Sequence, residues 1–253
     1  MIFPARTTLL ASALALSLVS PAWGQNALSQ AEPDSQLLSS AAFLEGHPDL
    51  RFRKRAERWY IQDQKSRAME NYRQAARFAD KHSQARIAEM LWAGDGVEPD
   101  RAIAYVWMDM AAERGYQAFL ARREHFWSRL DETDRARALR EGIALYETYG
   151  DEVAKPRMER ALIAGRRKVA GSRVGFVGSG TVFSAGPARG SGGGRPGMAG
   201  GAFEETLRNG QSFTTERFFD PAYWTPRFYW EWQLHLHTLT EHGTVEVGPL
   251  EAE

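Results

Sequence analysis

Three histidines near the C-terminus are the residues of this sequence best suited to hold a metal ion: His235, His237 and His242. On a strand, His235 and His237 would face the same way and could ligate zinc. On a helix the two would diverge by about 200°. Pro226 and the aromatic run at 227–232 favour a helix, and no clear third and fourth ligand accompanies the pair. We therefore expect partly exposed imidazoles and no metal site.

The sequence offers little for phosphate binding. Gly175, Gly178 and Gly180 form a GxxGxG pattern, which is not a nucleotide fingerprint. No Lys-Ser or Lys-Thr pair follows these glycines, and no helix is expected to open after them. We expect no nucleotide site and no cofactor.

The sequence lacks the residues usual for nucleophilic catalysis, because it has no GxSxG motif and no cysteine. Glu204 and Glu205 are paired carboxylates, but neighbours in sequence do not face each other on a helix. A carboxylate pair assembled across the fold, as in a glycosidase, stays open as an alternative. The prediction is a protein that is not an enzyme and has no catalytic residue.

Two aromatic runs, Phe218–Trp224 and Phe228–Trp232, could form a platform for sugar rings or for a partner peptide. The commoner explanation is a hydrophobic core, because aromatic side chains bury large areas and dominate core energetics. We favour the core interpretation.

Basic residues cluster at Arg51–Arg55 and at Arg166–Lys168. Anionic envelope polymers or lipid headgroups could use such clusters, although a solvated helix face is the commoner explanation. Lys+Arg and Asp+Glu both number 32, so the formal net charge is zero. A neutral, exported chain is not expected to bind nucleic acid.

The N-terminus has the three parts of a secretory signal. Arg6 is the positive residue, Leu9–Val19 is the apolar segment, and Ala22 and Gly24 are the small residues before a cleavage site at Gln25. The apolar segment is short for a membrane span, so an uncleaved anchor is the weaker alternative. We expect a periplasmic or secreted protein with no integral span after cleavage and, without cysteine, no disulfides.

Composition divides the rest of the chain into five parts, and the fold class that they predict is mainly α. The predicted order is a linker at 25–40, a helical solenoid at 41–150, a basic helix and short strand at 151–183, a Gly-rich flexible loop at 184–202, and an aromatic C-terminal segment at 203–253. Val174–Gly178 is the expected short strand, helices are expected within 203–239, and Thr244–Val247 is expected to be a terminal strand.

An internal repeat marks the helical half. Ala75 and Ala76 recur as Ala111 and Ala112, 36 positions later, and Ala68 recurs at Ala104 with the same spacing. A period in this range is the signature of stacked helix pairs.

One such pair can be followed residue by residue. A first helix is expected over Ser83–Ala93, with Ala85, Ala88 and Trp92 on one face. Gly94 is the natural left-handed C-cap, and Gly96 relaxes the turn. Pro99 is expected to start the second helix, where its missing N–H costs nothing.

The stretch Ala75–Ala112 resembles the Sel-like repeat family, relatives of the tetratricopeptide repeats. The resemblance rests on the two alanine pairs, on Ala93–Val97 with its two glycines, and on Trp107, all in register without a gap. Degenerate units at 48–76 and 115–149 extend it to roughly 100 residues. The residues that follow, 149–157 and 171–178, are similar to those after the repeats in exported proteins of gammaproteobacteria such as xanthomonads.

The resemblance implies a right-handed superhelix with a concave groove and the role of an adaptor that assembles other proteins, often in the cell envelope. A cysteine-rich branch of the family is linked to β-lactam binding, which does not carry over to a chain without cysteine.

The leading hypothesis is an exported protein–protein interaction scaffold of the cell envelope, with a protein or peptide partner. Polar side chains on the first helix of each pair are expected to line its groove, but the sequence identifies no individual binding residue and no oligomeric state. One alternative is a binder or hydrolase of cell-wall polymer that uses the aromatic segment at 203–253. Another is a structural role, in which that segment folds back and caps the repeats.

Overall fold

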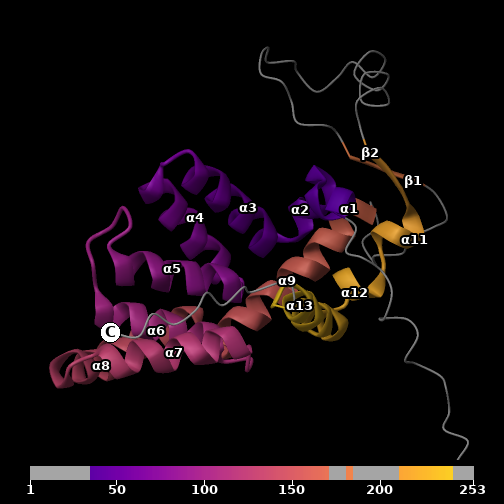
Figure 1. Cartoon of the computed structure of the whole chain (residues 1–253). Helices are drawn as coiled ribbons and strands as arrows, with labels where there is room; N and C mark the ends of the chain where they lie inside the picture. The colour runs from indigo at the N-terminus through magenta and orange to yellow at the C-terminus, as the bar shows by residue number, and fades with distance from the viewer. Residues whose placement is uncertain (1–34, 171–180, 185–210, 242–253) are drawn as a thin grey trace, which may run out of the picture. The chain divides into compact units, whose positions relative to one another are not determined.

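The computed structural model describes residues 35–170, 181–184 and 211–241, which are mainly helical, as the sequence predicts (Figure 1). All described elements belong to one compact unit of the chain, which begins at Ser35. In chain order the elements are α1 (Ser35–Ser39), α2 (Ala41–Gly46), α3 (Pro48–Ile61), α4 (Lys65–Ala76), α5 (Lys81–Ala93), α6 (Arg101–Ala112), α7 (Gln117–Arg129), α8 (Glu132–Tyr149), α9 (Asp151–Ala170), β1 (Thr181–Ser184), β2 (Gln211–Thr214), α11 (Thr215–Phe218), α12 (Pro221–Trp224) and α13 (Pro226–Glu241).

The period of 36 residues reappears in the helices themselves. Helices α4 and α6 each have 12 residues and both of their ends are 36 positions apart, and α5 and α7, with 13 residues each, keep the same offset. Successive helices pack from α3 to α6, as α3 with α4, α4 with α5, and α5 with α6. Helices α7 and α8 then each pack against α6.

The connection from α5 to α6 contains one residue in its predicted role and one outside it. Gly94 ends α5 in the left-handed conformation, with φ 69°, as predicted. Pro99 does not start α6, because Asp100 is the N-cap and its side chain accepts a hydrogen bond from the Ile103 N–H. The carboxylate satisfies one of the first N–H groups of the helix, which have no acceptor within the helix itself.

Five of the six repeat alanines, all except Ala75, lie in a first hydrophobic core, which is shared by α3–α8. Ala68, Ala76, Ala104 and Ala111 are fully buried, and Trp107 fills the space between helices. Small side chains let the helix axes approach closely, while the large ones fill the remaining volume at native density. The repeated alanines therefore lie where neighbouring helices meet.

A second core joins the first described helices to the last. It contains Leu37 of α1, Phe43 of α2, Met158 of α9, and Trp224 and Tyr229 of the aromatic segment, all fully or almost fully buried. The interpretation of the aromatic runs as core is confirmed for these residues.

The prediction of a linker over 25–40 is wrong at its C-terminal end. Residues 35–39 form α1, and Leu37 is buried in the second core, while Ser40 caps α2 by accepting from the Phe43 N–H. A helix of five residues shows no period, and its one buried leucine gave no sequence signal.

Helix α2 crosses α9 at two glycines. A Cβ on Gly46 would lie 2.4 Å from two atoms of the Trp224 ring, and a Cβ on Gly165 would lie 2.5 Å from the Gly46 Cα. The two backbones are therefore in direct contact, with the indole packed over them.

The described strands form a short antiparallel pair in which Val182 lies opposite Phe213. Residue 184 belongs to β1 and not to the predicted Gly-rich loop, and β2 was not predicted, because four-residue strands leave almost no alternating pattern. The predicted basic helix after residue 150 is α9, and the helices expected within 203–239 are α11–α13. The strands expected at 174–178 and 244–247, most of the Gly-rich loop, and residues 1–34 lie outside the described residues.

Candidate functional site

A groove of about 570 Å³ lies between α6, α8 and the start of α9. Its lining is apolar, aromatic and acidic, and contains no lysine or arginine. The lining residues are Tyr105, Val106, Asp109, Glu113, Ala138, Leu139, Gly142, Ile143, Tyr146, Glu147, Gly150, Glu152 and Val153.

Helix α8 supplies the apolar side of the groove. Leu139 and Ile143 are four positions apart, so they share one face of the helix, and they are 66% and 63% exposed. Gly142 between them lets α8 approach α6, because a Cβ there would lie 3.2 Å from the methyl groups of Val106. Two neighbouring aliphatic side chains are thus presented to solvent beside a hollow, which is typical of an interaction surface.

The carboxylates of the groove differ in their partners. Asp109 accepts a hydrogen bond from the Tyr146 hydroxyl at 2.7 Å and is paired with Arg123 at 3.4 Å. Burial, and then the hydrogen bond to Asp109, raise the pKa of Tyr146 well above its usual range. Glu147 and Glu152 have no cation within 4.0 Å among the described residues, so their charge faces the groove uncompensated.

An ion network under the groove fixes the start of α9 to α5 and α6. The buried Lys81 ammonium donates to the Met110 carbonyl at 2.7 Å and to Glu113 at 2.5 Å, and it lies 2.9 Å from Asp151. Arg114 donates two further hydrogen bonds to Asp151, at 2.8 and 2.9 Å. Each buried charge therefore has an opposite partner, which burial requires.

The pKa values in this network reflect that balance. Burial lowers the pKa of the Lys81 ammonium, and the carboxylates of Asp151 and Glu113 oppose the effect. Burial alone would raise the pKa of Asp151, but the hydrogen bonds and charge of Arg114, followed by the charge of Lys81, bring it below its usual value. Asp151 thus stays ionised and holds both cations in place.

Polar residues on the first helices of the pairs do not line this groove. Asp49 and Arg53 of α3 and Gln84 of α5 lie inside the structure, where Arg53 pairs with Asp80 at 2.9 Å and Gln84 donates to the Tyr149 carbonyl at 2.9 Å. The expectation that such side chains form the binding surface is wrong for these residues. Their partners are Asp80 at the start of α5, Tyr149 at the end of α8, and Tyr229 and Gln233 of α13.

A buried polar cluster that the sequence does not reveal lies where α13 packs on α3. The Tyr229 hydroxyl donates to Asp49 Oδ2, and Gln233 Nε2 lies 3.4 Å from the same oxygen. Burial, followed by the charge of Asp80, raises the pKa of Asp49 to about 7. Asp49 and Tyr229 are 180 positions apart, so no local pattern connects them.

His47 belongs to the same buried region. Its Nδ1 lies 2.8 Å from the Phe43 carbonyl and its Nε2 lies 2.9 Å from the Tyr223 carbonyl. Two carbonyl acceptors favour a protonated ring, but burial outweighs them and lowers the pKa of His47 to about 4. His47 has no titratable partner among these contacts, and its role is to tie α2 to α12.

Residues 235 and 237 lie within α13, so the strand that would align their side chains for zinc is not formed. No group of three potential ligands for a metal occurs within the described part of the chain. His242, Gly175, Gly178, Gly180 and the pair Glu204 and Glu205 lie outside the described residues.

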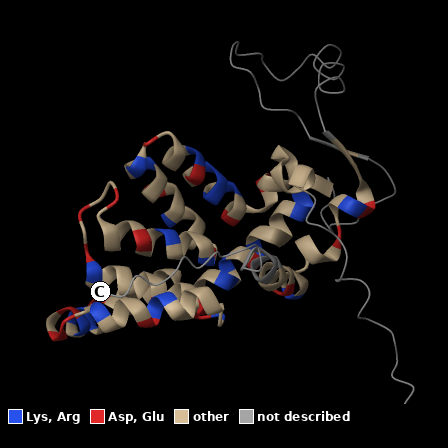
Figure 2. Cartoon of the chain, viewed as in Figure 1, with Lys and Arg blue, Asp and Glu red and all other residues tan. Residues whose placement is uncertain are grey.

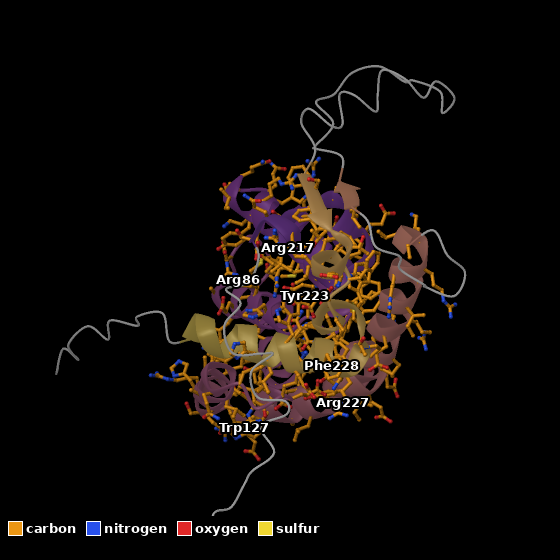
Figure 3. The ribbon with its side chains drawn as sticks, turned by 90° about the vertical axis from the view of Figure 1, so that its right-hand side faces the viewer. Arg86, Trp127, Arg217, Tyr223, Arg227 and Phe228 are labelled. Carbon is orange, nitrogen blue, oxygen red and sulfur yellow. The ribbon has the colours of Figure 1, made fainter. Side chains whose placement is uncertain are left out.

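The aromatic runs are mostly interior. Trp224 donates from its indole nitrogen to the Phe218 carbonyl at 2.6 Å, and Trp230 donates to Glu159 at 3.0 Å. Phe228, which is 39% exposed, lies beside Arg227, whose guanidinium is 5.9 Å from its ring (Figure 3). These positions do not make a row of exposed rings for sugar stacking.

The two predicted basic clusters have different surroundings. In the first, Arg53 is drawn inward by Asp80, while Arg51, Lys54 and Arg55 line a hollow at the surface of α3. In the second, at the end of α9, Lys168 pairs with Glu45 at 2.5 Å. The first cluster therefore keeps most of its charge unpaired.

Within the described residues, none of the helices combines the length and apolar character that a membrane crossing needs. No family model, curated protein or solved structure matches this chain. The candidate site is therefore identified from the geometry of this chain alone, and it is the groove between α6 and α8.

Proposed function

We propose that this protein is a binding scaffold of the cell envelope, which holds a partner polypeptide in the groove between α6, α8 and α9. The observation that carries the proposal is the pair Leu139 and Ile143, both largely exposed beside a hollow. Stacked helix pairs of the Sel-like type are the scaffold that the 36-residue repeat supports.

The partner that suits this groove is a segment with apolar side chains flanked by lysine or arginine. The apolar side chains would cover Leu139 and Ile143, and the cations would face Glu147 and Glu152. An amphipathic helix of this kind is a common occupant of such grooves. Charge complementarity would set the orientation of the bound segment and its rate of association more than its affinity.

A synthetic amphipathic peptide with leucine on one face and lysine on the other tests the proposal by fluorescence anisotropy. We expect the full chain to bind it, and Leu139→Glu with Ile143→Glu to weaken binding at least tenfold, because the contact surface loses its apolar centre. Ile163→Glu, an exposed isoleucine on α9 outside the groove lining, is the matched control and should bind as the parent does.

Reversing the charge makes the test specific. Glu147→Lys with Glu152→Lys should weaken binding of the lysine peptide and strengthen binding of a peptide in which glutamate replaces lysine. Equal affinity of parent and charge-reversed protein for both peptides would remove the groove as the binding site.

Location in the envelope rests on the N-terminal signal pattern. Sequencing the N-terminus of the protein recovered from the periplasmic or secreted fraction should give Gln25 as the first residue. Recovery of the chain only in the cytoplasm, with Arg6 retained, would contradict export.

A further inference from the structure

The solvent-facing side of α3 carries a row of cations that the groove does not involve. Lys54, Arg55 and Arg58 lie three, four and seven positions after Arg51, so the four residues share one face of the helix. We call these four residues the α3 basic stripe. Figure 2 shows lysine and arginine residues following one another along this helix.

The charges of the stripe are not used in ion pairs. Other basic residues of the described chain do lie within 4.0 Å of a carboxylate, as Arg137 does with Asp100. No member of the stripe has such a pair among the described residues, and the Arg51 Nε is buried there without a hydrogen-bond partner. Arg51 and Arg55 instead lie against the Phe52 ring, at 5.0 and 5.8 Å.

The stripe is associated with a hollow and with an exposed apolar side chain. A depression of about 530 Å³ is lined by the four cations, by Glu57 as its one carboxylate, and by Leu44 and Ile61. Ile61 continues the same helix face at the end of α3 and is 84% exposed.

We propose that the α3 basic stripe, with Ile61 beside it, binds the surface of an anionic lipid bilayer. Unpaired cations in a row attract lipid phosphates, and a large aliphatic side chain at the end of the row suits the boundary between headgroups and acyl chains. An extended single-stranded nucleic acid is the poorer fit, because Phe52 is half-buried beneath the arginines and offers no open ring for base stacking. This contact is peripheral and is separate from the groove between α6 and α8.

Vesicle flotation with the full chain tests the proposal. Vesicles of phosphatidylcholine alone are compared with vesicles that also contain phosphatidylglycerol. Residues 1–34 are the same in every variant, so a difference between variants on the anionic vesicles reports the substituted residues. We expect binding to the anionic vesicles that weakens at high salt, as for screened surface charges.

Two double variants separate the stripe from a general effect of charge. Arg55→Gln with Arg58→Gln should weaken binding to the anionic vesicles by about thirtyfold, the factor that two such cations contribute at an anionic surface. Arg73→Gln with Arg129→Gln removes the same charge from exposed sites on α4 and α7 and should leave binding unchanged. All four residues substituted are exposed, so circular dichroism should show the same helix content in each protein.

Four results would overturn the proposal: equal binding to neutral and anionic vesicles, no binding to either, parent-like binding by the Arg55 and Arg58 variant, or equal losses in the two double variants. Displacement by soluble glycerol phosphate would also overturn it, because the stripe would then be a site for a small phosphate and not for a bilayer. Leu139→Glu with Ile143→Glu should not alter flotation, so failure of the groove and failure of the stripe are distinguishable.

Discussion

Among single residues, the buried pair His47 and Asp49 couples the fold most directly to pH. The two lie at the start of α3 and are both buried, but their pKa values move in opposite directions from the usual ones. Their effects on stability therefore have opposite signs.

Asp49 titrates at a pKa of about 7 in the folded protein and about 3.9 when unfolded. Between these values the folded state keeps a proton that the unfolded state has lost, so the free energy of unfolding falls as the pH rises. His47 has a pKa of about 4 when folded and about 6.5 when unfolded. In that range the unfolded state holds the extra proton, so the free energy of unfolding rises with pH.

Asp49→Asn should expose the contribution of His47. Without the opposing carboxyl, we expect the free energy of unfolding to rise between pH 4 and 6.5 by an amount on the order of 3 kcal/mol, whereas the parent stays flatter. Urea unfolding at a series of pH values measures this. Asp63→Asn, at an exposed carboxylate, is the control, and parallel pH profiles for parent and Asp49→Asn would contradict the assignment.

Single residues also mark the limit of sequence analysis. Gly94 could be predicted as a C-cap because the requirement for positive φ is local. The hydrogen bond from Tyr229 to Asp49 could not, because the two residues come together only when α13 packs on α3. An aspartate in the first turn of a helix reads as a favourable surface charge until its burial is known.

Among the elements, α2 and α9 approach so closely that their backbones touch at Gly46 and Gly165. Gly46→Ala would place a methyl group 2.4 Å from two ring atoms of Trp224. We expect a loss of about 1–3 kcal/mol or more, the usual cost of overpacking a core. Thermal or urea unfolding measures it.

A double-mutant cycle identifies the cause. Trp224→Phe removes the ring atoms that the new methyl group would strike, so Gly46→Ala should cost less in that background. If the losses in the free energy of unfolding from Gly46→Ala and Trp224→Phe are additive, a clash with the indole does not cause the cost of Gly46→Ala.

Helices with a clear repeat of apolar residues could be predicted, whereas the short elements α1 and β2 could not. The alanine spacing predicted α5 to within two residues of its start, and Ala75 and Ala111 lie in helices that keep the 36-residue offset. Helix α1 and strand β2 have five and four residues, too few for a period of 3.6 or 2 to appear. The groove residues Leu139 and Ile143 follow helical spacing, but sequence alone does not separate an exposed aliphatic pair from a buried one.

In the molecule as a whole, the aromatic segment completes the second core. Phe213, Phe218, Trp224, Tyr229 and Trp232 supply half of its buried residues, which pack on α1, α2, α3 and α9. The proposed capping role of this segment therefore has specific contacts to support it, including Arg114 and Lys155 at 4.6 and 5.0 Å from the Trp230 ring.

A chain that ends at residue 210 should lose the second core. Removing several buried aromatic side chains costs more than the stability of a typical domain, since each contributes about 3–5 kcal/mol. We expect a lower melting temperature, less cooperative unfolding and binding of a hydrophobic dye by the shortened chain. Phe228→Ala, at an exposed ring of the same segment, is the control, and a shortened chain with unchanged cooperative melting would show that the second core is dispensable.

The second core has a consequence for synthesis. The contacts of α3 with α4, α4 with α5, and α5 with α6 join elements that are close in sequence, so they can form while translation continues. Leu37 and Phe43, in contrast, leave the ribosome long before the tryptophans that cover them have been made. Helices α1 and α2 therefore stay uncovered until the aromatic segment has been synthesised. Until then they present an apolar surface that a chaperone could shield.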